Sequence, residues 1–167
     1  MLLRLAPLLL AAVVFGGCGG GGGGSDGTST SSLAPGCEVE VAERAVTGFL
    51  DAVTAGTRAR IAARIATGDD FQGLDVEDPD GRSFSTGSRG RAIDYLAGRH
   101  RFGERVRLLR QLVAPGADAN HDDVQFTLTR TASDFPGRGI TNRLARGDGT
   151  IDCIHGTISR WHVQQLE

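Results

Sequence analysis

The side chains of this chain that could act as a general base or bind a metal ion are its carboxylates and its four histidines. A general base is usually an Asp or a His that an apolar wall holds opposite an acid or an oxyanion donor. Asp69 and Asp70 come directly after Gly68, and acids in that setting are typical of a solvated turn. His121 belongs to the polar segment 120–123, which also indicates a solvated turn. No histidine has the spacing of a metal site, so we predict no metal, no cofactor and no catalytic residue.

The N-terminal residues have the layout of an export signal. Met1 to Arg4 gives a positive start, and a mostly apolar stretch, residues 5–15, follows it. At a rise of about 1.5 Å per residue, this stretch spans only about 16 Å of a hydrocarbon core that is about 30 Å thick. Two small residues, Gly16 and Gly17, then precede Cys18. This arrangement resembles the lipobox of bacterial lipoproteins.

The resemblance implies that residues 1–17 are a lipoprotein signal peptide and that Cys18 becomes the acylated N-terminus, carrying groups such as palmitate. An ordinary signal peptide cut near Gly17, with Cys18 left as a free thiol, is the alternative. Residues 18–36 are rich in Gly, Ser and Thr and behave as a flexible tether with an r.m.s. reach of about 23 Å. We therefore expect a lipid-anchored protein on the extracytoplasmic face of the cell membrane.

The two other cysteines, Cys37 and Cys153, flank most of the remaining chain. An even pair of cysteines in an exported protein indicates a disulfide. In the chain-entropy interpretation, so long a loop contributes on the order of 4 to 5 kcal/mol to stability. Two buried free thiols are the alternative. The chain has no Cys-x-x-Cys spacing that would indicate a structural zinc site.

Composition indicates one globular domain, residues 37–167, without a nucleic-acid partner. The 167 residues are 40% hydrophobic and have a formal net charge of −2. Every basic residue is an arginine, and the chain lacks the dominant basic field of nucleic-acid-binding proteins. The densest group of cations predicts either a solvated outer face, paired with Glu104 and Asp94, or a site for an anionic ligand; it consists of Arg99, Arg101, Arg105, Arg107 and Arg110, with Arg130 expected nearby.

The elements that would position these residues follow from hydrophobic periodicity. Helical spacing predicts three helices, and alternation predicts two strand pairs and further strands. The predicted helices are 42–53, a shorter one that begins after Thr57, has Ile61 and Ile65 facing inward and ends at Gly68, and one from Ser88 to near His100. The predicted strands are 71–77, 82–85, 105–114, 123–131, 149–154 and 157–164. We expect a loop between the strand that ends at Thr131 and the strand that begins at Gly149.

This order of elements resembles the nuclear transport factor 2-like superfamily, the cystatin-like cone fold shared by ketosteroid isomerases, polyketide cyclases and many small exported domains. The resemblance rests on helix 42–53, on Phe84 leading into Ile93-Asp94-Tyr95-Leu96, and on the closing segment 149–161. It implies an α+β domain in which three N-terminal helices pack on a bent antiparallel sheet. In such a cone the first helix lies beside the last strands, so Cys37 and Cys153 could meet.

The related ketosteroid isomerases use a tyrosine on the first helix and two aspartates, and this pattern is not matched. The first helix has Phe49 instead, and Tyr95 belongs to the third helix. We therefore predict a domain that binds a small apolar ligand or an envelope protein without catalysis, with Phe49, Tyr95, Phe126 and Trp161 lining its pocket. The alternatives are a cone-fold isomerase, cyclase or dehydratase-type enzyme, and a purely structural domain that forms a homodimer through its sheet.

Overall fold

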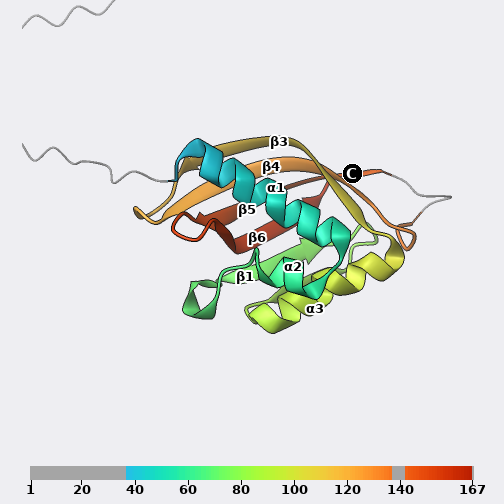
Figure 1. Cartoon of the computed structure of the whole chain (residues 1–167). Coiled ribbons are helices and arrows are strands. Elements are labelled where there is room, and N and C mark those ends of the chain that lie inside the picture. Colours follow the sequence, from blue (N-terminus) through green and yellow to red (C-terminus); the bar gives the residue numbers. More distant parts are fainter. Residues whose placement is uncertain (1–36, 137–141, 167) are drawn as a thin grey trace, which may run out of the picture. The chain divides into compact units, whose positions relative to one another are not determined.

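A computed structural model of the chain describes residues 37–136 and 142–166, which belong to one compact unit. The expected signal peptide, Cys18 and the tether lie outside the described residues. The elements, labelled in Figure 1, are α1 (Val39–Ala55), α2 (Arg58–Ala62), η1 (Gly68–Asp70), β1 (Gly73–Glu77), β2 (Ser83–Thr86), α3 (Arg89–Arg99), η2 (His100–Phe102), β3 (Arg105–Pro115), β4 (His121–Thr131), β5 (Arg143–Asp152) and β6 (Thr157–Gln165). Within the described residues, no helix is long and apolar enough to cross a membrane.

Helix α1 forms because its apolar residues recur every three or four positions and bury one face. Val46 and Phe49 on this face are almost completely buried. The helix ends at Gly56, which adopts the left-handed conformation with φ 66° and donates its N–H to the carbonyls of Ala52 and Val53. A glycine reaches this conformation without steric cost. The predicted first helix is therefore confirmed, including its end.

The six strands form one sheet in the order β2-β1-β6-β5-β4-β3. Neighbouring strands are antiparallel except at one place, where β1 runs parallel to β6 with Leu74 opposite Trp161. The prediction of a wholly antiparallel sheet is therefore wrong, and the sheet is mixed. Alternation within a strand shows which face is buried but contains no information on the direction of a neighbour that is distant in sequence.

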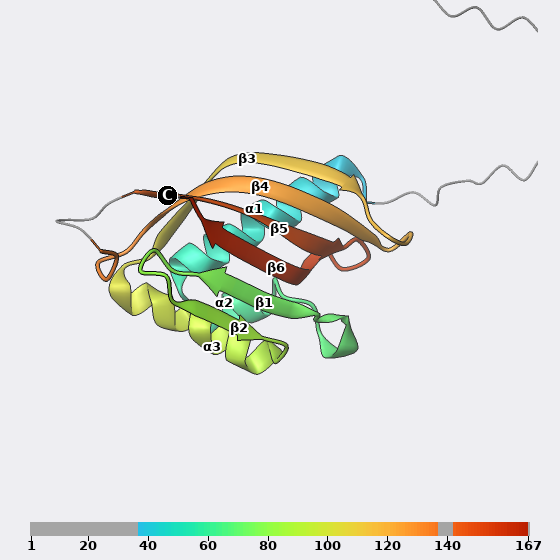
Figure 2. The same ribbon diagram turned by 180° about the vertical axis from the view of Figure 1, so that it is seen from behind.

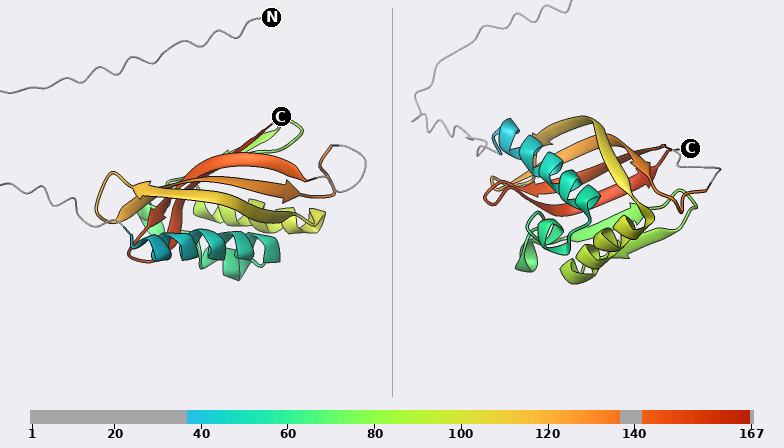
Figure 3. Two further views of the ribbon diagram at one scale, coloured as in Figure 1. Left: turned by 90° about the horizontal axis from the view of Figure 1, so that it is seen from above. Right: turned by 45° about the vertical axis from the view of Figure 1, so that its right-hand side comes forward.

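The helices lie on one face of the sheet (Figure 3), and the opposite face is seen in Figure 2. Inward-facing residues of β4, such as Val124 and Leu128, are buried, whereas Asp123 and Gln125, on either side of Val124, are exposed. We call the side of the sheet away from the helices the outer face. The α+β layering that the sequence predicts is thus present, with a hydrophobic core between α1 and the inner face of the sheet.

The two largest differences from the predicted element boundaries are in α2 and β5. Helix α2 ends at Ala62, and Ile65, expected to lie within this helix, instead forms a β-bridge with Ile158. Strand β5 begins at Arg143, although residues before Gly149 were expected in a loop. Glycines and charged residues in 143–149 hide the strand pattern, because the inward positions include Gly147 and the outward positions face solvent.

Cys37 and Cys153 form a disulfide with a Cα–Cα distance of 4.9 Å. The bond links the residue that precedes α1 to the turn between β5 and β6. Asp152 organises this turn, because its carboxylate accepts hydrogen bonds from the backbone N–H groups of Ile154 and His155. The predicted pairing is confirmed, and it fastens the start of the helical layer to the sheet.

Candidate functional site

The most concentrated group of charges within the described residues is buried beneath the end of α3. It consists of Asp78, Arg99, Glu104, Arg130 and Asp134, and we call it the buried ion cluster. Glu104 lies between two guanidinium groups: it accepts a hydrogen bond from Nε of Arg99 and another, of 2.7 Å, from Nε of Arg130. These three residues are 4%, 6% and 3% exposed. The cluster therefore belongs to the interior of the fold.

The other two carboxylates complete the pairing of the arginines. Asp134 accepts two hydrogen bonds from Arg99, of 2.7 and 2.9 Å, and Asp78 accepts one of 3.0 Å from Arg130. Both guanidinium groups also lie over the ring of Phe135, at 5.4 and 5.3 Å from its centroid. Buried charges are tolerated when they are paired and hydrogen-bonded in this way.

The pKa shifts in the cluster have identifiable causes. Burial by itself would lower the pKa of Arg130, but the negative charge of Glu104 and its hydrogen bond outweigh burial, so the pKa is raised. Burial raises the pKa of Tyr95, and the neighbouring carboxylate of Asp78 raises it further. The Tyr95 hydroxyl therefore stays protonated and donates a 3.2 Å hydrogen bond to Asp78. The hydrogen bond from Tyr95 thus helps to hold the Asp78 carboxylate in its position in the cluster.

The four predicted pocket residues do not enclose a ligand-sized cavity. Phe49 contacts Trp161 edge-on with ring centroids 5.0 Å apart, and Phe126 stacks on Trp161 at 4.0 Å. The remaining cavity, lined by Phe49, Tyr95 and Trp161 among others, has a volume of about 30 Å³. That is roughly the volume of one water molecule, whereas sites for small organic ligands usually have about 300 to 1,000 Å³. Side chains fill the inside of the cone.

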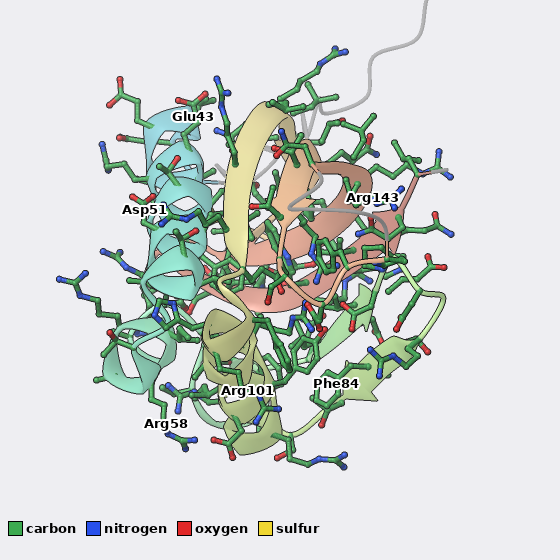
Figure 4. The ribbon with its side chains drawn as sticks, turned by 90° about the vertical axis from the view of Figure 1, so that its right-hand side faces the viewer. Glu43, Asp51, Arg58, Phe84, Arg101 and Arg143 are labelled. Carbon is green, nitrogen blue, oxygen red and sulfur yellow. A yellow bond between two sulfur atoms is a disulfide. The ribbon has the colours of Figure 1, made fainter. Side chains whose placement is uncertain are left out.

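A shallow cleft of about 340 Å³ lies between α3 and strand β2, and Asp78, Arg99 and Asp134 of the buried ion cluster are among the residues that line it. Figure 4 labels two residues on its opposite sides, Phe84 and Arg101. The Phe84 ring stacks on Tyr95 with centroids 4.1 Å apart, and Tyr95 and Arg99 line both this cleft and the small interior cavity. Arg101 lies against the Phe102 ring at 4.9 Å.

A larger hollow lies on the outer face of the sheet. We call it the outer groove; it has a volume of about 600 Å³ and is lined by outward side chains of β3, β4, β5 and β6, among them Arg110, Asp123, Thr127, Arg146, Arg160 and His162. Asp148 in its floor accepts a 3.2 Å hydrogen bond from Arg160 and lies 3.0 Å from Nδ1 of His162. Asp123 accepts a 3.0 Å hydrogen bond from Thr150.

Two cations of the outer groove lack an acidic neighbour. Among the described residues, no carboxylate oxygen lies within 4.0 Å of Arg110 or Arg146. Within the described parts of the chain, the Arg146 guanidinium donates hydrogen bonds only to the side-chain oxygen of Gln164, at 3.3 and 3.4 Å. The pairing register places Thr127 between the two arginines, one on each neighbouring strand. The groove can therefore accept a carboxylate there.

The predicted cation cluster is divided by the fold. Arg99 and Arg130 are buried, so the expectation of a solvated outer face is wrong for them, and Glu104 pairs with both inside the domain. Asp94 pairs instead with Arg58. The reason for the burial of Arg130 is visible in the strand pattern, because it continues the inward series of Val124, Phe126 and Leu128. Asp69 and Asp70 are exposed, in agreement with a solvated turn.

Comparisons with known proteins identify the fold. No known family profile matches the chain, and no curated protein matches it. Solved structures do: a candidate dehydratase of the NTF2-like family from Streptomyces avermitilis is 15% identical, with a TM-score of 0.61 over 77% of this chain and 96% of that one. A candidate scytalone dehydratase from Novosphingobium aromaticivorans is 13% identical, with a TM-score of 0.61 over 77% and 84%.

A third similar structure is a protein of unknown function with a cystatin-like fold from Methylobium petroleophilum, 12% identical, with a TM-score of 0.54 over 80% of both chains. At these identities the likeness establishes the fold and leaves the activity open. The domain therefore has the NTF2-like, cystatin-like cone fold that the sequence predicted.

Proposed function

We propose that this protein is a non-catalytic, lipid-anchored protein of the cell envelope that pairs with a second copy of itself through the outer groove. The observation that supports this proposal is the distribution of space in the domain. The interior retains about 30 Å³, whereas the outer groove has about 600 Å³. An apolar ligand inside the cone would need room that the core side chains occupy, so we place the binding surface outside.

The charges of the outer groove are complementary to themselves. Consider two copies that face each other across a twofold axis lying in the interface at right angles to the strands and passing through Gln125. Thr127 of one copy then faces Asp123 of the other, because these residues lie two positions on either side of Gln125 on β4. Arg110 and Arg146 flank Thr127, so both come within reach of the partner's Asp123. Complementary charges of this kind fix the register of an interface.

The enzymatic alternative is consistent with the names of two similar structures, which are candidate dehydratases. Catalysis of that kind needs a carboxylate or an imidazole that is free to take a proton from the substrate. Each carboxylate of the buried ion cluster already accepts hydrogen bonds from guanidinium groups. We therefore favour assembly over catalysis.

The pairing is tested by cysteine crosslinking of the full lipidated chain in membranes. Gln125→Cys puts a thiol at the proposed axis, so mild oxidation is expected to link two chains there. Arg91→Cys, an exposed position on α3, is the matched control and should give only background crosslinking. Background crosslinking at Gln125→Cys, or equal crosslinking at both positions, would overturn the proposal.

Charge reversal tests the same interface a second way. In the Gln125→Cys background, Arg146→Glu places a carboxylate beside the partner's Asp123 and should lower the crosslinked fraction roughly tenfold, since like charges at an interface cost several kcal/mol. Adding both Asp123→Arg and Arg110→Glu, which reverses the other two charges as well, should restore most of it. An unchanged crosslinked fraction in the single variant would show that these charges do not meet.

The anchor has a separate test. The intact mass of protein extracted from the membrane fraction should correspond to a chain that begins at Cys18 and bears fatty acyl groups. An N-terminus at any other residue, or an unmodified Cys18, would contradict the lipid anchor while leaving the pairing to be judged by crosslinking.

A further inference from the structure

The disulfide has an acidic neighbour in the interior of the domain. The sulfur atoms of Cys37 and Cys153 and a carboxylate oxygen of Asp122 all lie within 4.8 Å of one another. Asp122 is on β4, and its Cα is paired with those of Ile151 on β5 and Pro115 on β3. It is only 3% exposed. Three elements of the fold thus bring two sulfurs and one carboxylate to a single place.

The carboxylate of Asp122 is incompletely satisfied. Its Oδ1 atom is buried and has no hydrogen-bond partner within the part of the chain that the structure describes. A buried polar atom without a partner is costly and calls for an explanation, of which a bound ion is one. Asp152, at the same end of the sheet, shows the contrast, because its two oxygens accept hydrogen bonds from Ile154, His155 and Thr157. Asp122 has no comparable structural task.

We propose that Cys37, Asp122 and Cys153 form a zinc site when the disulfide is reduced. Thiolate sulfur and carboxylate oxygen are zinc ligands at about 2.3 Å and 2.0 to 2.2 Å, and zinc in proteins is tetrahedral. The three side chains supply three of the four ligands, and water supplies the fourth. The site is closed in the oxidised protein, because the two sulfurs are then bonded to each other.

The chemistry balances with a phosphine as reductant. The phosphine gives two electrons to the sulfur–sulfur bond and becomes a phosphine oxide by taking the oxygen of one water molecule, whose two protons pass to the sulfurs. Zn²⁺ then displaces both thiol protons to solvent as it binds, because the thiolate is the metal ligand.

The zinc ion would link the segments that the disulfide links. Cys37 precedes α1 and Cys153 lies between β5 and β6, so either crosslink fastens the helical layer to the sheet. The metal adds a third attachment, to β4 through Asp122. A chain that has not yet been oxidised could therefore be held in its folded form by the metal.

The test uses the full chain with Cys18→Ser, so that no third thiol contributes, after reduction by a phosphine. One equivalent of Zn²⁺ should bind and raise the Tm of the reduced protein by roughly 5 to 10 °C, since an ion that binds only the folded state stabilises it. The oxidised protein should show neither effect. Co²⁺ in place of Zn²⁺ should give a sulfur-to-metal charge-transfer band.

Asp122→Asn should weaken Zn²⁺ binding to the reduced chain by about tenfold or more. Asp51→Asn is the matched control, because this carboxylate is exposed on α1, and it should bind as the reduced parent does. Cys37→Ser should abolish the charge-transfer band. Failure of the reduced parent to bind, or equal binding by Asp122→Asn, would overturn the proposal, and neither result would bear on the pairing through the outer groove.

Discussion

Glu104→Gln should lower the free energy of unfolding by about 3 to 5 kcal/mol, the range observed when one partner of a buried ion pair is removed. The variant keeps the size of the side chain but removes its charge from between two guanidinium groups. In the parent, the two oxygens of Glu104 accept hydrogen bonds from Nε of Arg99 and Nε of Arg130. In the variant, the NH₂ group of the glutamine replaces one of these oxygens, so a donor faces a donor. Two buried cations are then left with only Asp78 and Asp134.

Urea-induced unfolding of the oxidised full chain measures this effect without adding salt that would screen the charges. Asp94→Asn is the control. Its ion pair with Arg58 is exposed, with side chains 56% and 65% accessible, so its loss should cost less than about 1 kcal/mol. If both variants lowered the free energy of unfolding by the same small amount, the buried ion cluster would not stabilise the fold more than an exposed ion pair does.

The fold was largely predictable because its elements have strong local signals. The apolar spacing of α1 and the alternation in β4 mark both a secondary structure and its buried face. The parallel pairing of β1 with β6 had no such signal, since the two strands are separated in the sequence by most of the domain. The first part of strand β5 was hidden for a different reason, because Gly147 lacks the side chain by which an inward face is recognised.

The candidate sites also differ in whether a local sequence signal predicts them. The cysteine count alone was enough to predict the disulfide, once export was inferred. The buried ion cluster was missed because it depends on residues far apart in sequence: Arg130 pairs with Asp78 and Glu104. The inward phase of Arg130 could have indicated that a buried acid must meet it, but the phase does not say which acid. The outer groove depends on the twist and order of four strands, which no local pattern contains.

The two inward glycines of β5 lead to the second large prediction, because they make room for the aromatic stack. In the pairing register, Gly147 lies between Phe126 and Val163, and Gly149 lies between Val124 and Trp161. The rings of Phe126 and Trp161 can therefore approach each other across β5, at a centroid distance of 4.0 Å. A side chain on either glycine would occupy that space.

Gly147→Ala should be close to incompatible with the fold. A Cβ atom there would lie 2.0 Å from the carbonyl oxygen of His162 and 2.5 Å from the Phe126 ring. The oxygen belongs to the backbone of β6, which hydrogen bonds hold in register, so it cannot move away cheaply. Because overpacking of a rigid core forces backbone shifts, we expect a loss of more than about 4 kcal/mol, or no folded protein.

A series of three alanines makes this prediction measurable by thermal unfolding and by the yield of folded protein. Gly149→Ala should be damaging but milder, since its Cβ would meet the Arg160 carbonyl at 2.8 Å and the Trp161 ring at 2.9 Å. Gly98→Ala should be neutral or stabilising by up to about 1 kcal/mol, because nothing lies within 4 Å of its Cβ and alanine favours the helix. If position 147 tolerated alanine as well as position 98 does, then Phe126 and Trp161 could not be stacked across β5, and the filled interior on which the outer-face proposal depends would have to be abandoned.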